Sequence, residues 1–174
     1  MNGEGESSNE SEFPHGNRVL RGLCHWEHAP EVEAGFGDLL LKDPFAHGNL
    51  LGQIAESKSQ RGLGGSGRYR RERDYRCPLE YAPTNVGSPP WLGELKAKGR
   101  PVRKRSNKHF EWRLYFGEAI NRRDHVIGIK LGDKKPSLTE AQNRVHQRKQ
   151  IGAAMKYLKR YFKDKGYRWA PFPG

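Results

Sequence analysis

The amino-acid sequence predicts an α+β fold, in which a small antiparallel sheet packs with a C-terminal helix behind a disordered or irregular N-terminal extension. Residues 111–116 alternate between apolar and polar side chains, which is the two-residue period of a strand. Capping residues and apolar residues at helical spacing follow Pro136 and indicate a helix. Only 34% of the 174 residues are hydrophobic, which predicts that much of the chain packs no core.

The first sixty residues offer little that can be buried. Residues 1–17 consist mainly of Gly, Ser, Asn and Glu, a composition typical of a disordered acidic tail. In residues 18–60 short apolar patches are broken by prolines and glycines, which predicts a poorly packed segment with one short helix. That helix is expected at about residues 44–58, because Asp43 can serve as its N-cap and Pro44 suits the first helical position.

Residues 61–90 are predicted to form a linker and a basic arm rich in Gly, Arg and Pro. Residues 61–67 are flexible by composition, and the prolines of residues 78–90 predict an ordered but irregular loop. The arm between them has tyrosines among arginines, which can stack on bases and hold phosphates. It can equally be a solvated basic arm whose tyrosines dock on the protein. The candidate nucleic-acid-binding residues of the arm are Arg70, Arg71 and Arg73.

Residues 91–174 form the expected compact domain, which begins with a three-stranded antiparallel meander. Strand alternation turns Arg113 and Tyr115 away from the face that carries Trp112, Leu114 and Phe116. The apolar face is therefore expected to contact the core, and the polar face is expected to meet solvent. The predicted strands are residues 91–96, 111–116 and 125–131, and a very basic loop at 98–108 joins the first two.

A helix is predicted for the C-terminal part of the chain. Ser137 and Glu140 stand at the spacing of a capping box. The first apolar residues of this region lie on a helical stripe that is rotated by roughly 130° from the stripe of the later ones. Because one straight helix cannot bury both stripes, we expect a break at about 146–150 and then a helix over 149–165 that Gly166 ends.

Charge is strongly polarised along the chain. Residues 1–57 contain 3 basic and 10 acidic residues, whereas residues 58–174 contain 29 basic and 10 acidic ones. The basic part repels itself unless an anion or an acidic partner neutralises it, so nucleic acid is the leading partner. A soluble protein with a merely basic surface is the alternative, because net charge bears on partners and not on fold. Further candidate nucleic-acid-binding residues are Arg103, Lys104, Arg105, Arg122 and Arg123.

No metal, cofactor or membrane site is predicted. Cys24 and Cys77 form no Cys-x-x-Cys pair, and no second ligand pair at zinc-finger spacing follows the histidines beside Cys24. The chain has no phosphate-binding glycine loop and no nucleophile elbow. It also has no apolar stretch long enough for a membrane helix and no signal peptide, so we expect a soluble cytoplasmic protein.

Candidate chemistry comes from polar residues at the outward strand positions. Cleavage of RNA without a metal needs a base for the ribose 2′-hydroxyl, cations for the developing negative charge and an acid for the leaving oxygen. Basic residues and a tyrosine on one sheet surface can fill these roles, although they can equally be ordinary outward strand residues. The predicted catalytic residues are Arg113, Tyr115, Lys130, Lys134 and Lys135.

Three segments carry a resemblance to a known family. They read Phe110-Glu-Trp-Arg-Leu-Tyr-Phe116, His125-Val-Ile-Gly-Ile-Lys-Leu-Gly-Asp-Lys134 and Gln150-Ile-Gly-Ala-Ala-Met155. Residues 91–165 thereby resemble the C-terminal half of RelE/ParE/HigB-type toxins of bacterial toxin–antitoxin systems. In that superfamily a strand with a Glu-x-Arg-like element precedes a hydrophobic strand, a Gly-Asp-Lys turn and a helix. Arg113 matches the strand arginine and Lys134 the lysine of the turn, whereas Lys135, Arg122 and Arg123 match more loosely.

The resemblance implies a small sheet with helices packed on one face. For the RelE and HigB branches it implies cleavage of mRNA, often on the ribosome, and an acidic antitoxin partner. The N-terminal helical hairpin usual in the family is not evident before Trp91. ParE-like members poison gyrase instead, so similarity of fold does not settle the chemistry.

Two main functions and a third interpretation are therefore expected. The first is the toxin of a type II toxin–antitoxin system, acting as a metal-independent endoribonuclease on mRNA. The second is a non-enzymatic nucleic-acid-binding module, because a three-stranded sheet followed by a helix is also the layout of arm-type DNA-binding domains of some recombinases. The third is a basic domain that binds an acidic protein, including its own acidic residues 1–57.

Overall fold

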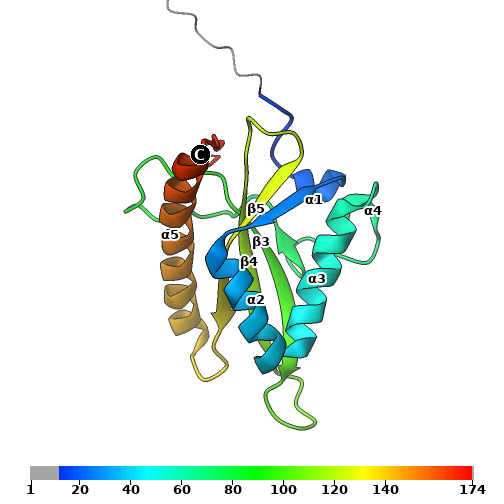
Figure 1. Cartoon of the computed structure of the whole chain (residues 1–174). Helices are drawn as coiled ribbons and strands as arrows, with labels where there is room; N and C mark the ends of the chain where they lie inside the picture. Colours follow the sequence, from blue (N-terminus) through cyan, green and yellow to red (C-terminus); the bar gives the residue numbers. More distant parts are fainter. Residues whose placement is uncertain (1–11, 174) are drawn as a thin grey trace, which may run out of the picture.

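The computed structural model describes residues 12–173, and a five-stranded sheet lies at their centre (Figure 1). The strands follow the order β1-β5-β4-β3-β2, in which β1 is parallel to β5 and the other neighbours are antiparallel. The strands are β1 (His25–His28), β2 (Tyr75–Arg76), β3 (Gly93–Pro101), β4 (His109–Glu118) and β5 (His125–Lys134). The helices are α1 (Arg18–Arg21), α2 (Pro30–Lys42), α3 (Pro44–Lys58), α4 (Gly62–Gly65) and α5 (Glu140–Lys165).

The α+β class and the antiparallel meander of β3, β4 and β5 are confirmed. Two further strands extend this meander, since β1 pairs with β5 and β2 pairs with β3. β3 continues to Pro101, so it takes up the first part of the predicted basic loop. The remaining loop, residues 102–108, projects beyond the sheet (Figure 1). Residues 78–90 contain neither helix nor strand, as predicted.

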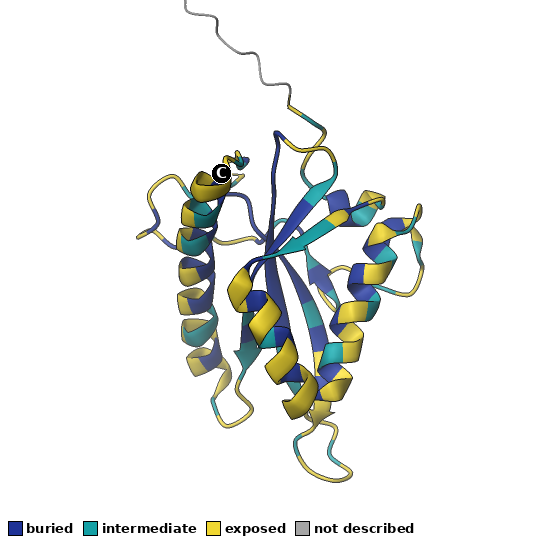
Figure 2. Cartoon of the chain, in the orientation of Figure 1, coloured by how far each residue is buried: buried dark blue, intermediate teal, exposed yellow. Residues whose placement is uncertain are grey.

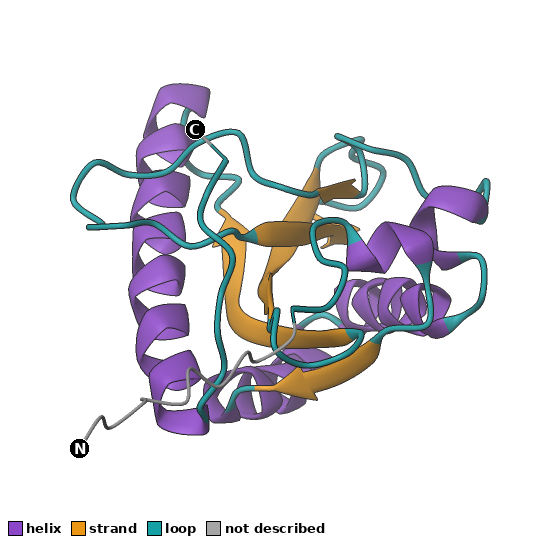
Figure 3. Cartoon of the chain, turned by 90° about the horizontal axis from the view of Figure 1, so that it is seen from above, coloured by secondary structure: helices purple, strands orange, loops and turns teal. Residues whose placement is uncertain are grey.

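Helices cover both faces of the sheet, and each face has its own hydrophobic cluster (Figures 2 and 3). α2 and α3 lie on one face and α5 lies on the other (Figure 3). A sheet covered on two sides needs apolar residues on both, which explains why β4 and β5 alternate so little in burial near their middle. The first cluster includes Val32, Phe36, Leu50, Ile54, Leu95, Leu114 and Phe116. The second includes Tyr115, Ile127, Ile129, Met155, Leu158 and Phe162.

The prediction that residues 18–60 pack poorly is wrong. Helix α3 has the predicted bounds, and the Asp43 carboxylate accepts the N–H of Ala46 at 3.2 Å as an N-cap does. Strand β1 and helix α2 were not predicted, and they belong to the sheet and to its first layer of helices. The apolar residues of α2 and α3 that are buried recur at helical spacing and belong to one cluster, and this is sufficient for packing although other apolar residues such as Leu41 stay exposed.

Gly62 and Gly64 allow residues 61–67 to pack closely, so the prediction of a flexible linker is also wrong. The segment contains α4, and Leu63 within it is fully buried. Gly62 has a φ of +62°, and a Cβ atom there would lie 2.4 Å from the carbonyl oxygen of Leu20. A residue with a side chain would therefore clash with α1. The glycine content that suggested a flexible linker is what allows this close contact.

The acidic tail was predicted for residues 1–17, of which residues 1–11 lie outside the described part of the chain. Residues 12–17 lead into a buried anchor and do not extend into solvent as a separate tail. Arg18 is 1% exposed, and its guanidinium donates to the carbonyl oxygens of Ala119 at 2.9 Å and His125 at 2.7 Å. Its backbone N–H donates to Glu118 Oε1 at 2.7 Å. The chain before α1 is thus tied to the end of β4.

Helix α5 runs without a break over 26 residues, which contradicts the predicted interruption at residues 146–150. The helix ends at Gly166, whose φ is +70°, as expected for a left-handed C-cap. The capping box is formed by Thr139 and Gln142, and the predicted pair Ser137 and Glu140 does not form it. Within residues 12–173 no helix combines the length and the apolar character that crossing a bilayer requires.

The missing break has a simple cause in the first turns of α5. Val145 remains 53% exposed and Ala141 is exposed too, so α5 does not bury the first apolar stripe. Polar side chains face the sheet instead. Asn143 Nδ2 donates to the carbonyl oxygen of Lys135 at 3.0 Å, and Gln150 Nε2 donates to Asp133 Oδ1 at 3.0 Å. The polar side chains on the buried side of this straight helix thus have hydrogen-bond partners, where apolar contacts were expected.

Candidate nucleic-acid interface

Strand register assembles a group of charged side chains at one end of the sheet, on the face that α5 covers. Lys98 of β3 pairs with Glu111 of β4, which pairs in turn with Lys134 of β5. Directly paired side chains have Cβ atoms about 5 Å apart, so the three form one row across three strands. We call Lys98, Glu111 and Lys134 the charged row. β4 is exposed at its first residue and becomes buried from Arg113 onward, so the row lies at the accessible end of the strand.

One arginine links the central carboxylate of the charged row to a buried carboxylate. Arg113 Nη2 donates to Glu111 Oε1 at 2.8 Å, and Arg113 Nε lies 3.5 Å from Glu94 Oε2. Glu94 is fully buried, and burial raises its pKa although the Arg113 charge opposes that shift. The Arg113 side chain is only 8% exposed. Arg113 therefore bridges a buried carboxylate and an accessible one, and it fixes the position of Glu111.

His109 extends the site by one step along β4. It lies two residues before Glu111 and so on the same face of the strand, and both residues line a pocket of about 270 Å³ with Lys98 and Lys134. His109 Nδ1 is 2.9 Å from the carbonyl oxygen of Gly99. A carbonyl oxygen only accepts, so Nδ1 carries a proton, and Nε2 is the nitrogen that can exchange a proton with a ligand.

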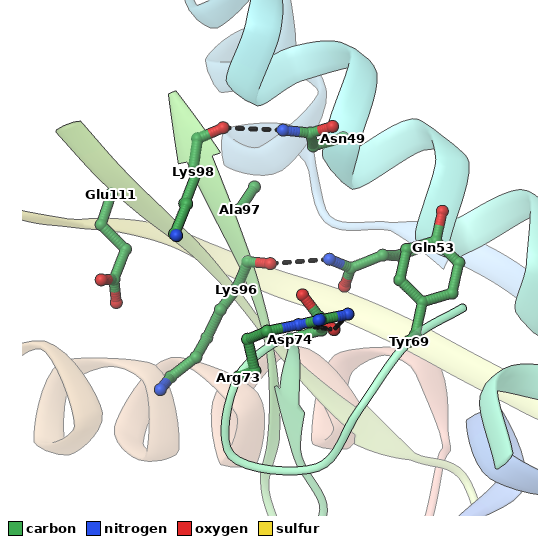
Figure 4. A pocket seen from close by; sticks show the side chains of 9 residues that line it. All are labelled: Asn49, Gln53, Tyr69, Arg73, Asp74, Lys96, Ala97, Lys98 and Glu111. Carbon is green, nitrogen blue, oxygen red and sulfur yellow. Dashed lines mark hydrogen bonds and ion pairs between the residues drawn. The ribbon is translucent and has the colours of Figure 1, made fainter. Parts of the chain in front are cut away.

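A second pocket, of about 300 Å³, adjoins the charged row at the edge of β3 (Figure 4). Helix α3 closes this edge, because Gln53 Nε2 donates to the carbonyl oxygen of Lys96 at 2.6 Å and Asn49 Nδ2 donates to that of Lys98 at 2.7 Å. The two lysine side chains extend away from α3 (Figure 4). Burial lowers the pKa of Lys96, whose ammonium donates to the carbonyl oxygen of Glu72 at 2.7 Å.

The structure brings together two of the five predicted catalytic residues. Arg113 and Lys134 both adjoin Glu111, and Lys134 Nζ also lies 2.9 Å from Glu140 Oε1 at the start of α5. Lys135 is exposed, and its backbone holds Asn143, so it lies beside the charged row without belonging to it.

The other two predicted catalytic residues lie deeper along the strands. Tyr115 is fully buried beneath α5, where its hydroxyl donates to Gln150 Oε1 at 3.3 Å. Burial raises the pKa of Tyr115 strongly. Lys130 is half-buried and pairs with Tyr115. The expectation that Tyr115 faces solvent is wrong, because α5 covers the polar face of the sheet at this point, and Tyr115 cannot touch a substrate there.

The predicted nucleic-acid-binding residues divide into three places. Arg103, Lys104 and Arg105 are exposed on loop 102–108, which adjoins His109. The arm residues lie beside β2, where Arg73 lines the pocket of Figure 4 and pairs with Asp74 at 2.7 Å. Arg122 and Arg123 lie in the turn between β4 and β5, at the opposite end of the strands, so they are not part of this site. Arm residues Arg70 and Arg71 and turn residues Arg122 and Arg123 are all exposed.

The functional candidates that sequence reasoning missed are Lys98, Glu111 and His109. Glu111 shares the outward parity of Arg113, and this signal was present in the alternation of residues 111–116. Lys98 was assigned to a loop because the length of β3 was underestimated. His109 belongs to the site only because β4 begins two residues earlier than the pattern indicated.

A second cluster of titratable side chains joins β1, β5 and the end of α5. The Glu27 carboxylate accepts hydrogen bonds from the hydroxyls of Tyr161 at 2.5 Å and Tyr167 at 2.6 Å, and it lies 2.7 Å from His125 Nε2. Burial favours the neutral acid, but these three partners prevail and lower the pKa of Glu27 to about 2. With every group of this cluster engaged by another, its effect is to fasten α5 to the edge of the sheet.

Metal-ligating residues do not gather in the described part of the chain. Residues 12–173 contain no group of three or more His, Cys, Asp or Glu side chains placed to hold a metal ion. Cys24 and Cys77 are both free and buried, and burial raises the pKa of Cys24 to about 12.

No family model matches the sequence, and neither a curated protein nor a solved structure matches it significantly.

Proposed function

We propose that the protein is a metal-independent endoribonuclease whose site is the charged row together with His109. One observation carries the proposal: a carboxylate, Glu111, stands between lysines of the two neighbouring strands, with an imidazole two residues away on the same face. A phosphate bound between these lysines contacts both cations and lies next to a carboxylate that can act as a base.

The proposed reaction is transfer of the phosphodiester to the neighbouring 2′-hydroxyl. Glu111 takes the proton from the 2′-hydroxyl, and the 2′-oxygen forms a bond to phosphorus. Lys98 and Lys134 stabilise the additional negative charge on the phosphorane. His109, as the imidazolium, donates its Nε2 proton to the 5′-oxygen as that bond to phosphorus breaks, and it becomes the neutral ring with its proton on Nδ1. The products are a 2′,3′-cyclic phosphate and a 5′-hydroxyl, so atoms and charge balance without water.

The order of elements agrees in part with the family resemblance on which the cellular role rests. The helices cover both faces of the sheet, where the resemblance implies helices on one face, so that part of the expectation is wrong. The helix pair α2 and α3 lies before Trp91, where the resemblance calls for a helical pair that the sequence did not reveal. Three antiparallel strands and a helix follow it. On this basis we infer the role of a toxin that acts on mRNA, including mRNA on the ribosome, with an acidic antitoxin as its protein partner.

A cleavage assay tests the enzymatic proposal. The purified protein is incubated with a single-stranded RNA and with the DNA of the same sequence, both in EDTA. The protein is expected to cleave the RNA into fragments ending in 2′,3′-cyclic phosphate, detected by mass spectrometry, and to leave the DNA intact. Glu111→Gln and His109→Asn are each expected to slow cleavage by about 10²- to 10⁴-fold. His15→Asn removes an exposed histidine far along the chain from the site and serves as the matched control.

Two results would overturn the enzymatic proposal. One is RNA that stays intact in EDTA, and the other is equal cleavage by the wild type and by both site variants. Expression in a bacterium tests the inferred role: the wild type is expected to arrest growth, and Glu111→Gln is expected to relieve the arrest. Normal growth with abundant wild-type protein would contradict the toxin role while leaving the chemistry to the first assay.

A non-enzymatic nucleic-acid-binding module is the second candidate, and the exposed basic loop 102–108 favours it. Arg103, Lys104 and Arg105 can contact phosphates without the participation of any group that transfers a proton. Binding would then weaken steeply with salt, and the salt dependence would fall by about one unit for each lost phosphate contact. Salt-dependent binding of intact RNA, with the loop residues dominant and Glu111→Gln neutral, would favour this candidate over the enzyme.

A further inference from the structure

A third cavity adjoins the charged row at the end of the sheet, and the reaction proposed above does not use it. It measures about 570 Å³, a volume within the usual range of small-molecule sites. It shares Glu111 and Lys134 with the charged row, but Phe110 and Trp112 have the opposite strand parity and lie on the face that α2 and α3 cover. A chain bound at the row therefore reaches this cavity by passing around the end of the sheet. The residues that give this cavity its character are two aromatic and four basic ones: Phe110, Trp112, Lys42, Arg100, Lys134 and Lys135.

A planar surface of mixed aromatic and cationic character lies in this cavity. The Arg100 guanidinium carbon is 4.6 Å from the centroid of the Phe110 ring, which is the distance of a cation–π contact. Phe110 and Trp112 are both half-buried. A guanidinium stacked on a ring presents a flat, delocalised face, on which a nucleobase can stack.

A single buried carboxylate holds this surface in place. Asp43 is 1% exposed, and both of its oxygens accept the backbone N–H of Arg100 at 3.0 Å. Asp43 Oδ2 also accepts the indole N–H of Trp112 at 3.2 Å. The same residue begins α3, so the surface is anchored to the helix layer as well as to the sheet. A preformed surface loses little conformational freedom when it binds a ligand.

We propose that this cavity receives one unstacked base of single-stranded RNA, next to the phosphate held by the charged row. The assignment of the phosphate rests on the proposed function. The base stacks on the Arg100–Phe110 pair, and Lys42 and Lys135 contact the phosphates that flank it. A base in this cavity cannot remain paired within a duplex, so the site selects single strands, loops and ends over double-stranded RNA.

The test measures binding separately from cleavage. A ten-nucleotide RNA with 2′-O-methyl groups cannot undergo transfer to its 2′-oxygen, so it remains intact even with an active enzyme. It is used as a single strand and as a duplex, with a 2-aminopurine base as a fluorescent reporter of stacking. The full-length wild type is expected to bind the single strand more tightly than the duplex and to change the 2-aminopurine emission.

Charge-conserving variants isolate the stacking surface from general electrostatic attraction. Arg100→Lys keeps the positive charge and loses the planar group. Arg160→Lys is the matched control, because Arg160 is exposed on α5 and its guanidinium carbon lies 5.1 Å from the centroid of the Tyr157 ring, away from the charged row. Arg100→Lys is expected to weaken single-strand binding by about five- to a hundredfold, the size of one base–aromatic contact. Phe110→Ala is expected to act in the same direction, with an unchanged salt dependence because no charge is removed.

Each outcome decides between the two proposals. Equal affinity for single strand and duplex, or equal effects of Arg100→Lys and Arg160→Lys, overturns the base site while RNA cleavage continues to support the enzyme. Loss of single-strand binding in Arg100→Lys, in a protein that never cleaves unmodified RNA, supports the base site and overturns the enzyme. A wild-type protein that binds neither RNA overturns both.

Discussion

The Glu27 carboxylate on β1 lies 2.7 Å from Nε2 of His125 on β5, at the same edge where the hydroxyls of Tyr161 and Tyr167 donate to it. Three elements that are distant in the sequence thus meet at one acid. The Glu27 side chain is 22% exposed, so solvent only partly screens these contacts. Its ionised form is the one that the cluster stabilises.

This arrangement predicts a specific acid lability. The pKa of Glu27 is lowered to about 2 from its ordinary value of 4.5, so its contribution to the free energy of unfolding is complete above that ordinary value. The contribution is lost as the pH falls from 4.5 through about 2. Glu27→Gln is expected to lose stability at pH 7, by about 1 to 3 kcal/mol, and to show a flatter pH dependence in this window. Denaturant unfolding between pH 2 and pH 7 measures both effects, with the exposed Glu31→Gln as the control.

Arg18 provides a second test of stability. It is 1% exposed beside the buried Glu118, whose nearest carboxylate oxygen is 3.8 Å from Arg18 Nε. Arg18→Met leaves that carboxylate buried without its cation and is expected to cost about 3 to 5 kcal/mol in urea unfolding. The exposed Arg21→Met on the same short helix should change stability by no more than about 0.5 kcal/mol. Similar losses in both variants would refute the anchoring role of Arg18.

Two glycines of α2 should respond in opposite directions to the same substitution. A Cβ atom on Gly35 would lie 2.8 Å from Leu131 Cδ1, whereas one on Gly37 would meet nothing within 4 Å. Gly35→Ala is therefore expected to destabilise the protein by about 1 to 3 kcal/mol through overpacking. Gly37→Ala is expected to stabilise it by up to about 1 kcal/mol through helix propensity. Thermal unfolding of the two variants compares them directly, and a shared sign would contradict the packing of α2 on β5.

Tyr115 distinguishes the proposed site from the one expected from the sequence. Its hydroxyl makes a single buried hydrogen bond to Gln150 and has no access to solvent. Tyr115→Phe is expected to retain cleavage within about threefold of the wild type, and to cost at most about 1.5 kcal/mol of stability. Loss of cleavage in a folded Tyr115→Phe protein, comparable to that of Glu111→Gln, would restore Tyr115 to the site.

Local signals in the sequence predicted those elements whose ends and faces are set by neighbouring residues. Helix α3 follows from Asp43 and Pro44, and the end of α5 follows from Gly166. β1 could not be predicted in this way, because its four polar and aromatic residues become a strand only beside β5. Helix α2 was obscured by two glycines, one of which allows Leu131 to approach. Such packing depends on partners that a local pattern does not contain.

The sequence predicted the kinds of residues in the proposed site, but not which residues belong to it. Arg113 and Lys134 followed from strand parity and from the family resemblance. The charged row required the register of three strands, which places Lys98 and Lys134 on either side of Glu111. Tyr115 has the same parity as Arg113, and only the path of α5 separates a covered position from an accessible one.

The pairing of β1 with β5 has a consequence for how the chain reaches its native state. His25 is aligned with His125, so a contact across a hundred residues completes the sheet. Contacts of such large sequence separation carry a high loop-closure cost and form slowly. During synthesis, β5 leaves the ribosome long after β1, so the N-terminal third must wait for its partner strand. In a truncated chain without β1, the edge of β5 would be open to pairing with other chains. Such truncated chains are therefore expected to aggregate.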